Sequence, residues 1–351
     1  MKLSIMPGPA ITVDPDLFPT QTETYPEDWE SETTSIASSI YRGFMENGRR
    51  YQTLKQEGYM NPSDEQMFET YEAGHLVALI LDSERDNPLF RSPIGDKPKH
   101  ILDLGTGKGT WAIDVADLFQ DATVRGVDLF PPPASWIPPN CRLEVDNVLK
   151  EWTWQEPFDL IHLRIMTAAF DSAETDMVYQ ECYDHIRPGG WIEQLEASPV
   201  IECDDNSLPP DSILRTWGPS LLGCAARWGR KLDTIDTMAE SIRKAGFVDM
   251  HDVDYKWPIG PWPKNQQLKE AGTVNYQHWM SGLEGWCMFL LTKFGEPEPW
   301  SKAEVDTWVS KIRAELKNPR LHVYQRVRRV YARKPFPEEN VSAYAATETT
   351  A

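Results

Sequence analysis

The chain has 351 residues, of which 40% are hydrophobic and 25% are charged, a composition typical of a folded globular protein. Its formal net charge is −19, so a phosphate backbone would be repelled, and we expect no direct nucleic-acid binding. The sequence has no run of 18 apolar residues, and its five cysteines are scattered without a C-x-x-C pair. These features argue against a membrane span, a disulfide framework and a metal site.

The two ends differ in composition from the rest of the chain. Residues 1–34 hold seven acidic side chains against one lysine, are rich in Pro and Thr, and show no hydrophobic period. Such a segment cannot bury enough apolar surface to fold, so we expect a disordered acidic tail. We expect a second disordered tail at 337–351. Between them we predict a helical cap over 35–98 and an α/β domain over 99–336.

The expected cap has a helical pattern from Ser35 to about Leu81. Within it, Asn61-Pro62-Ser63-Asp64 is typical of a helix start, with Ser63 as the predicted N-cap. Large side chains then recur every four residues, as on one face of a helix, at Met67, Tyr71, His75 and Leu79.

From His100 onward, short apolar strands alternate with helical segments. This alternation predicts an α/β fold with a Rossmann-like, doubly wound and mostly parallel sheet. The predicted strands are 101–104, 123–128, 142–145, 158–163 and 190–195, and the predicted helices are 110–119 and 173–186. Two helical additions follow at 208–245 and 264–317, with further strands expected at 247–257 and 326–333.

The strongest functional signal lies in His100–Ala116, where a strand runs into a glycine-rich turn and then a helix. Gly105, Gly107 and Gly109 lack a Cβ, so the turn can be tight and a ligand can approach its backbone. The first turn of the helix then offers free N–H groups to a polar ligand. A dinucleotide fingerprint would need its third glycine one residue later, where this chain has Thr110.

Acidic side chains around this turn indicate which ligand it binds. Asp103 suits a ligand with an ammonium group and a sulfonium, and S-adenosylmethionine (SAM) carries both. Asp128 ends the second strand, 23 residues after Gly105, where a carboxylate can accept both ribose hydroxyls. Asp146-Asn147 follows the third strand and could accept the exocyclic amine of adenine. Each feature alone would fit an ordinary turn or helix cap, but together and in this order they predict a SAM site.

These segments resemble the class I SAM-dependent methyltransferases and, within them, the fungal LaeA-like family. The resemblance covers about residues 40–336, and it rests on Tyr41–Gln52, Asn61–Gln66, Leu102–Asp117, Gly126–Cys141, Phe158–Arg164, Ile186–Glu196, Cys203–Ser207 and Pro258–Asn265. It implies a cofactor site made by Asp103, Gly105, Thr106, Gly107, Asp128, Leu129, Asp146, Asn147 and the segment around His162. One departure is Lys108, where family members commonly have Thr, and this change could alter the charge of the site.

Two polar residues end the fourth predicted strand. His162 lies beside the expected methionine end of SAM and is the candidate catalytic residue, able to orient or deprotonate an acceptor. The alternative is a structural histidine that bonds the backbone. Arg164 is expected to pair with Glu193 or Glu196.

The chain contains 14 tryptophans, an unusually large number. Those in the C-terminal half either line an aromatic acceptor pocket or pack in the core. They are Trp217, Trp228, Trp257, Trp262, Trp279, Trp286 and Trp300.

The sequence supports three functional hypotheses. The first is a cytoplasmic, SAM-dependent enzyme without a metal, which methylates oxygen or nitrogen of a small molecule in fungal secondary metabolism. The second is a LaeA-like nuclear regulator that acts with a protein partner, and the third is a protein methyltransferase. No basic nuclear-import run is visible, because Arg326, Arg328 and Arg329 fall within a predicted strand, and this favours the enzyme.

Overall fold

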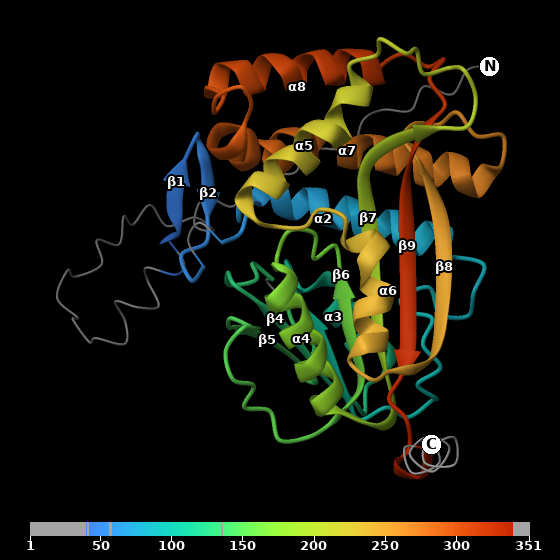
Figure 1. The fold of residues 1–351 in the computed structure, drawn as a ribbon. Helices are drawn as coiled ribbons and strands as arrows, with labels where there is room; N and C mark the ends of the chain where they lie inside the picture. Colours follow the sequence, from blue (N-terminus) through green and yellow to red (C-terminus); the bar gives the residue numbers. More distant parts are fainter. Residues whose placement is uncertain (1–39, 41, 56–57, 135, 340–351) are drawn as a thin grey trace, which may run out of the picture. The chain divides into compact units, whose positions relative to one another are not determined.

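The computed structural model describes residues 40, 42–55, 58–134 and 136–339. In this part of the chain a seven-stranded sheet carries helices on both faces, and further helices gather over one end of it (Figure 1). The predicted tail at 1–34 lies outside the described residues, as does the second tail after residue 339.

The sheet is mostly parallel, and only β9 runs against its neighbours. Strand order reverses at the centre, between β3 and β6, so the carboxyl ends of the parallel strands line one crevice. This topology confirms the predicted doubly wound α/β fold. In spatial order the strands are β5 (Cys141–Val145), β4 (Thr123–Asp128), β3 (His100–Leu104), β6 (Phe158–Arg164), β7 (Ile186–Cys203), β9 (Val323–Arg333) and β8 (Val248–Pro258).

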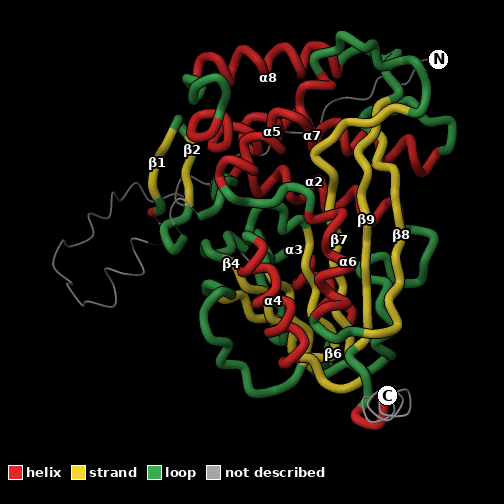
Figure 2. The backbone as a smooth tube through the Cα atoms, viewed as in Figure 1, coloured by secondary structure: helices red, strands yellow, loops and turns green. Residues whose placement is uncertain are grey.

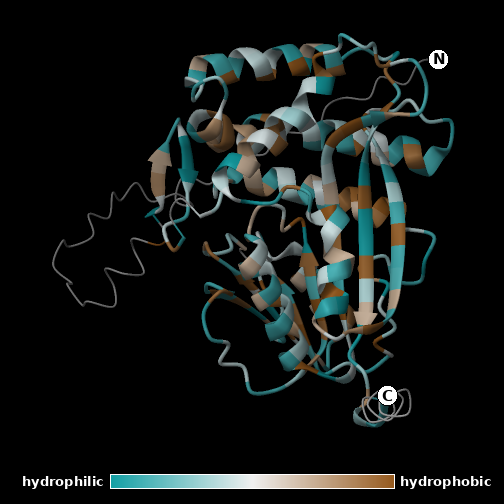
Figure 3. Ribbon diagram, in the orientation of Figure 1, coloured by the Kyte–Doolittle hydropathy of each residue, from teal (hydrophilic) through white to brown (hydrophobic). Residues whose placement is uncertain are grey.

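Helices cover both faces of this sheet because its central strands are apolar on both sides. α3 (Thr110–Leu118) packs on one face, while α4 (Ser172–His185) and α6 (Thr234–Lys244) pack on the other (Figures 1 and 2). The buried residues of β6 show why this is required, since Leu160, Ile161 and Leu163 are all inaccessible to solvent. The central strands stand out accordingly as apolar in Figure 3.

A separate helical layer lies over the carboxyl ends of the parallel strands (Figure 1). Within it α2 packs along α7, and α7 also packs against α5 and α8. The layer has its own core, in which the Trp217 ring stacks on Trp308 with centroids 5.3 Å apart. The four helices are α2 (Glu65–Leu81), α5 (Leu214–Trp228), α7 (Gln266–Phe294) and α8 (Lys302–Leu316). Of the predicted addition at 208–245, α5 joins this layer, whereas α6 packs on the sheet.

The structure corrects the helical pattern predicted from Ser35 to Leu81. A β-hairpin formed by β1 (Phe44–Glu46) and β2 (Arg49–Tyr51) precedes α2. Its turn residues, Asn47 and Gly48, have φ angles of +51° and +81°. Two consecutive left-handed residues make the tight turn that suits antiparallel strands, and Asn-Gly is its usual sequence. This local signal outweighs the helical spacing around it.

Two element boundaries also differ from the prediction. Asp64 rather than Ser63 caps α2, because its side chain accepts the N–H of Met67 and is held by an ion pair with Arg49. β7 extends well beyond the predicted 190–195, because it pairs with β6 over one part of its length and with β9 over a longer part.

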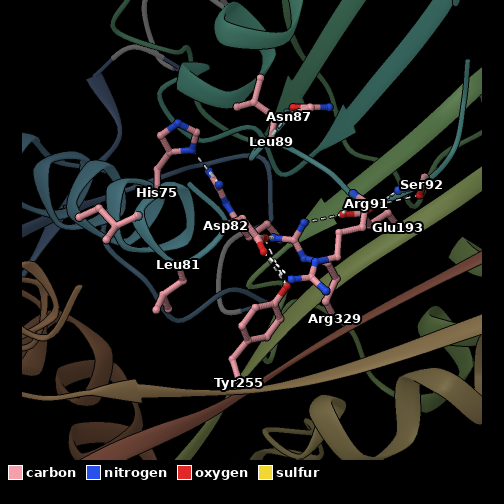
Figure 4. Close-up of polar contacts among 12 residues, drawn as sticks. His75, Leu81, Asp82, Asn87, Leu89, Arg91, Ser92, Glu193, Tyr255 and Arg329 are labelled. Carbon is pink, nitrogen blue, oxygen red and sulfur yellow. Dashed lines mark hydrogen bonds and ion pairs between the residues drawn. The ribbon is translucent and has the colours of Figure 1, made fainter. Parts of the chain in front are cut away.

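A buried ion network ties the end of α2 to the sheet (Figure 4). Arg329 of β9 pairs with Glu193 of β7 at 2.9 Å and with Asp82, the residue that ends α2, at 3.0 Å. Arg91 also pairs with Asp82, and Ser92 donates to Glu193 through its hydroxyl and its N–H. Asp82, Glu193 and Arg329 are each at most 3% exposed. The network therefore fixes α2 relative to β7 and β9.

Removing Arg329 should be strongly destabilising, because it leaves Asp82 and Glu193 buried with fewer partners. We expect Arg329→Met to lower the free energy of unfolding by about 3–5 kcal/mol in urea titrations. Arg326→Met, which removes a more exposed arginine of the same strand, should cost at most about 1 kcal/mol. Equal losses in the two variants would contradict this assignment.

Candidate active site

The glycine-rich turn after β3 is bound tightly to the neighbouring strand. The N–H groups of Gly105 and Thr106 both donate to the carbonyl of Val127, at 2.9 and 3.0 Å. Gly105 has a φ of +70°, and a Cβ there would lie 2.4 Å from the sulfur of Met166. Both features favour glycine at this position. Because glycine has no side chain, the backbone of the turn is directly exposed to the cavity that Gly105 lines.

Asp128 ends β4 beside this turn. Its carboxylate accepts the N–H groups of Gly107 and Leu129, both at 2.8 Å. Burial raises the pKa of Asp128 to about 6, although these hydrogen bonds act in the opposite direction. At the end of β5, Asp146 accepts the N–H of Asn147 at 2.7 Å. Three successive strand ends thus present polar groups at one edge of the sheet.

The turn and these strand ends open on a cavity of about 200 Å³. One part of its wall, here called the cofactor half, comes from the turn, the ends of β4 and β5, and the residues between Tyr59 and Tyr71. The residues of the cofactor half are Tyr59, Asn61, Tyr71, Gly105, Thr106, Gly107, Asp128, Leu129, Asp146, Asn147 and Val148. The structure therefore brings together seven of the eight residues predicted to bind the cofactor.

Asp103 and His162 are absent from the residues that line this cavity. Asp103 accepts the hydroxyl of Thr106 and the Nδ1–H of His162, both at 2.7 Å. The His162 ring stacks on Trp111 with centroids 3.8 Å apart, and burial lowers its pKa. We infer that the pair supports the turn from behind, so an acceptor-facing role for His162 is not favoured by its surroundings.

A second part of the cavity wall, here called the tryptophan half, comes mainly from α5, α7 and the ends of β7 and β8. Its residues are Ser198, Trp217, Leu221, Leu232, Trp257, His278, Trp279 and Trp286. Trp217 and Trp279 both line the cavity and pack in the helical core, so the two alternatives for the tryptophans hold together. The indole N–H of Trp279 is buried and has no hydrogen-bond partner among the described residues.

His278 is a cavity residue for which the sequence carried no signal. One ring nitrogen, Nδ1, lies 2.7 Å from the carbonyl of Thr70 on α2. A carbonyl only accepts, so Nδ1 carries the hydrogen and Nε2 keeps a free lone pair. Burial lowers the pKa of His278 to about 4, so the ring is neutral at pH 7. Because its partner lies 208 residues away, only the tertiary fold reveals this arrangement.

Arg164 does not form the ion pair predicted from the sequence. Glu193 is taken by Arg329, and Glu196 accepts the N–H of Met166 and the hydroxyl of Thr167. Arg164 instead lines the cavity and donates to Nδ1 of His75 at 2.8 Å.

Glu196 has a different role from the predicted ion pair. Its carboxylate is fully buried and accepts three hydrogen bonds, two from the segment after β6 and one from Gln194. This segment includes Ile165, whose φ of +53° is unfavourable for a β-branched residue. Ile165 lines the cavity, so Glu196 helps to hold strained backbone at the site.

The cofactor half fits SAM chemically. The Gly105 turn provides the close backbone approach that a nucleoside with an amino-acid tail requires, since no Cβ projects there. The Asp128 carboxylate retains acceptor capacity for ribose hydroxyls, and the buried Oδ1 of Asn61 lacks a partner and can accept a further N–H or O–H. Among the described residues, no three His, Cys, Asp or Glu side chains form a group that could hold a metal ion.

The chain is similar to known methyltransferases. The Methyltransferase domain family matches residues 75–253. Methyltransferase pytC of Aspergillus terreus is 33% identical over 310 residues, covering 88% of this chain and 93% of the relative. Secondary metabolism regulator LAE1 of Cochliobolus heterostrophus is 33% identical over 299 residues, covering 83% and 95%. A Haemonchus contortus phosphoethanolamine N-methyltransferase 2 in complex with SAM aligns with a TM-score of 0.41 at 16% identity, over 69% of this chain and 50% of that one.

The fold, the site and these matches define a SAM-dependent methyltransferase of the class I type. Within that class, the chain belongs to the fungal LaeA-like methyltransferase family. Its cofactor is SAM. None of the described helices is long and apolar enough to span a bilayer.

Losing the Asp128 carboxylate should weaken cofactor binding. Charge-assisted hydrogen bonds to ribose contribute about 1.5–3 kcal/mol, so Asp128→Ala should lower SAM affinity at least about tenfold in calorimetry. Asp121→Ala, which removes an exposed carboxylate from the opposite end of β4, is the control and should bind normally. Unchanged affinity in folded Asp128→Ala would refute the ribose assignment.

The raised pKa of Asp128 predicts a pH dependence of binding. The group accepts two hydroxyls only as a carboxylate, and it is protonated below about pH 6 in the free protein. SAM affinity should therefore be constant above about pH 7 and fall as the pH drops through 6. Burial raises the pKa of the neighbouring Tyr59 and Tyr71, so they do not titrate there. Asp128→Asn should flatten the profile, and an unchanged profile would exclude Asp128 as its source.

Proposed function

We propose that this enzyme transfers the methyl group of SAM to an oxygen or nitrogen of a small, partly aromatic or peptide-like molecule of fungal secondary metabolism. The main observation is that one cavity joins the cofactor half to the tryptophan half. Indole faces and aliphatic side chains favour a compact, planar acceptor over an extended chain.

The bound cofactor supplies an activated methyl group on a sulfonium, and the protein supplies alignment and a dry site. His278 is suited to orient the acceptor, because its Nε2 lone pair can accept the O–H or N–H of the attacking atom. The unpartnered indole N–H of Trp279 can donate to a second polar group of the acceptor.

The cap takes part in this function in our proposal. α2 contributes Tyr71, Gly74 and His75 to the cavity wall, and the segment before it contributes Lys55 and Tyr59. Residues 35–98 would then close the site over the cofactor, while 99–336 form the catalytic domain. The cap would be a fixed lid rather than a moving one, since the buried network at Asp82 ties α2 to the sheet.

A regulatory role is the second candidate, because several similar proteins bear the name secondary metabolism regulator. It would place the chain in the nucleus with a protein partner. The apolar, aromatic wall of the tryptophan half favours the biosynthetic role, since it suits a compact ligand.

The test uses labelled SAM with two acceptor pools, namely metabolite extract from a strain that lacks the gene, and bulk histones. Label should enter a small product. His278→Phe should lower that turnover by about tenfold or more while SAM affinity is unchanged, because the Nε2 lone pair is lost and a planar ring of similar size remains, although the hydrogen bond to Thr70 is lost as well. His251→Phe, on the exposed strand β8, is the matched control. Faster labelling of histones than of any small product would overturn the proposal.

A further inference from the structure

Arg164 is a cation in the cavity wall for which the fold provides no carboxylate partner. It ends β6, is half-buried, and lines the cavity. No ion pair is formed by its guanidinium within the described part of the chain, and its polar contact is the ring of His75. Burial lowers the pKa of Arg164 to about 10, which still leaves it charged at pH 7. Asp103 and Asp114 attract the guanidinium but form no ion pair with it, so it keeps N–H donors that can bind an anion in the cavity.

The surroundings hold this arginine in one orientation. A guanidinium only donates, so Nδ1 of His75 must accept, and the hydrogen of the ring lies on Nε2. Nε2 then donates to the carboxylate of Asp114 at 2.8 Å. Burial and the charge of Arg164 lower the pKa of His75, in keeping with a neutral ring. The chain Asp114–His75–Arg164 therefore joins α3, the cap helix α2 and the end of β6.

The other charged groups near the cavity have partners within the protein, and Lys55, a second cation of the cavity wall, pairs with Glu174. Asp103 bonds to Thr106 and His162, and Asp128 bonds to two backbone N–H groups. SAM carries two cationic groups, the sulfonium and the ammonium, and one anion, its α-carboxylate. A guanidinium in the wall repels the first two and attracts the third, and its planar donors match a carboxylate.

We propose that Arg164, oriented by His75 of the cap helix, binds the α-carboxylate of SAM. The cap helix then takes part in cofactor recognition as well as in covering the site. This inference does not depend on the identity of the acceptor. A role of Arg164 in binding an anionic acceptor is the competing explanation.

The test compares SAM with decarboxylated SAM, which lacks the carboxylate and keeps both cationic groups. Calorimetry of Arg164→Met should show SAM affinity reduced at least about tenfold, because charge-assisted hydrogen bonds are lost. Affinity for decarboxylated SAM should be unchanged or higher, because a repelling cation is removed. His75→Phe should weaken SAM binding less, with no loss for decarboxylated SAM.

Arg187→Met is the matched control, because Arg187 lies on the neighbouring strand β7, pairs with Asp159, and is not among the cavity residues. It should bind both ligands like the wild type. The melting temperature of ligand-free Arg164→Met should fall only slightly, since the variant loses the hydrogen bond to His75 but no internal ion pair.

Two results would overturn the proposal. Unchanged SAM affinity in Arg164→Met would exclude the cofactor carboxylate and leave an anionic acceptor as the partner. Equal losses for SAM and decarboxylated SAM would show that Arg164 only shapes the site. Both results concern cofactor binding, so they are distinct from any failure to find a small-molecule acceptor.

Discussion

The site depends on how the glycine-rich turn is bound to β4. Gly105 and Thr106 donate to the carbonyl of Val127, and Gly107 donates to the side chain of Asp128. These bonds satisfy three N–H groups of the turn and hold the turn in place at the cavity wall. They also place the carboxylate of Asp128 beside it. The position of this acid beside the turn, where it can accept ribose hydroxyls, therefore follows from this one connection.

Buried polar groups have two different roles in the described part of the chain. Asp103 with His162, and Arg329 with Asp82 and Glu193, are satisfied internally and hold elements in place. Such groups stabilise one arrangement of α2 and the sheet, because breaking any pair would leave a buried charge without its partner. The polar groups of the cavity wall are less completely satisfied. Nε2 of His278 and the indole N–H of Trp279 keep hydrogen-bonding capacity that an acceptor could use.

The sequence predicted what depends on local pattern. Short segments of sequence are enough to predict the central strands, the turn at Gly105 and the acid at Asp128. The structure places the turn and the acid together at one edge of the sheet. The Asn47-Gly48 hairpin was equally local and was missed because the surrounding spacing looked helical. His278 could not be found in this way, since its role depends on Thr70, a residue distant in sequence. The predicted partners of Arg164 were wrong for a similar reason, because Glu193 is claimed by Arg329 from a strand near the end of the chain.

The central claim is that one cavity places the reactive end of the cofactor against a tryptophan-lined acceptor pocket. A crystal structure with bound S-adenosylhomocysteine tests this most directly. The account predicts ribose hydroxyls on Asp128 and a thioether sulfur that faces the pocket of Trp279 and His278. A sulfur directed toward bulk solvent, or a nucleoside bound away from the Gly105 turn, would contradict it.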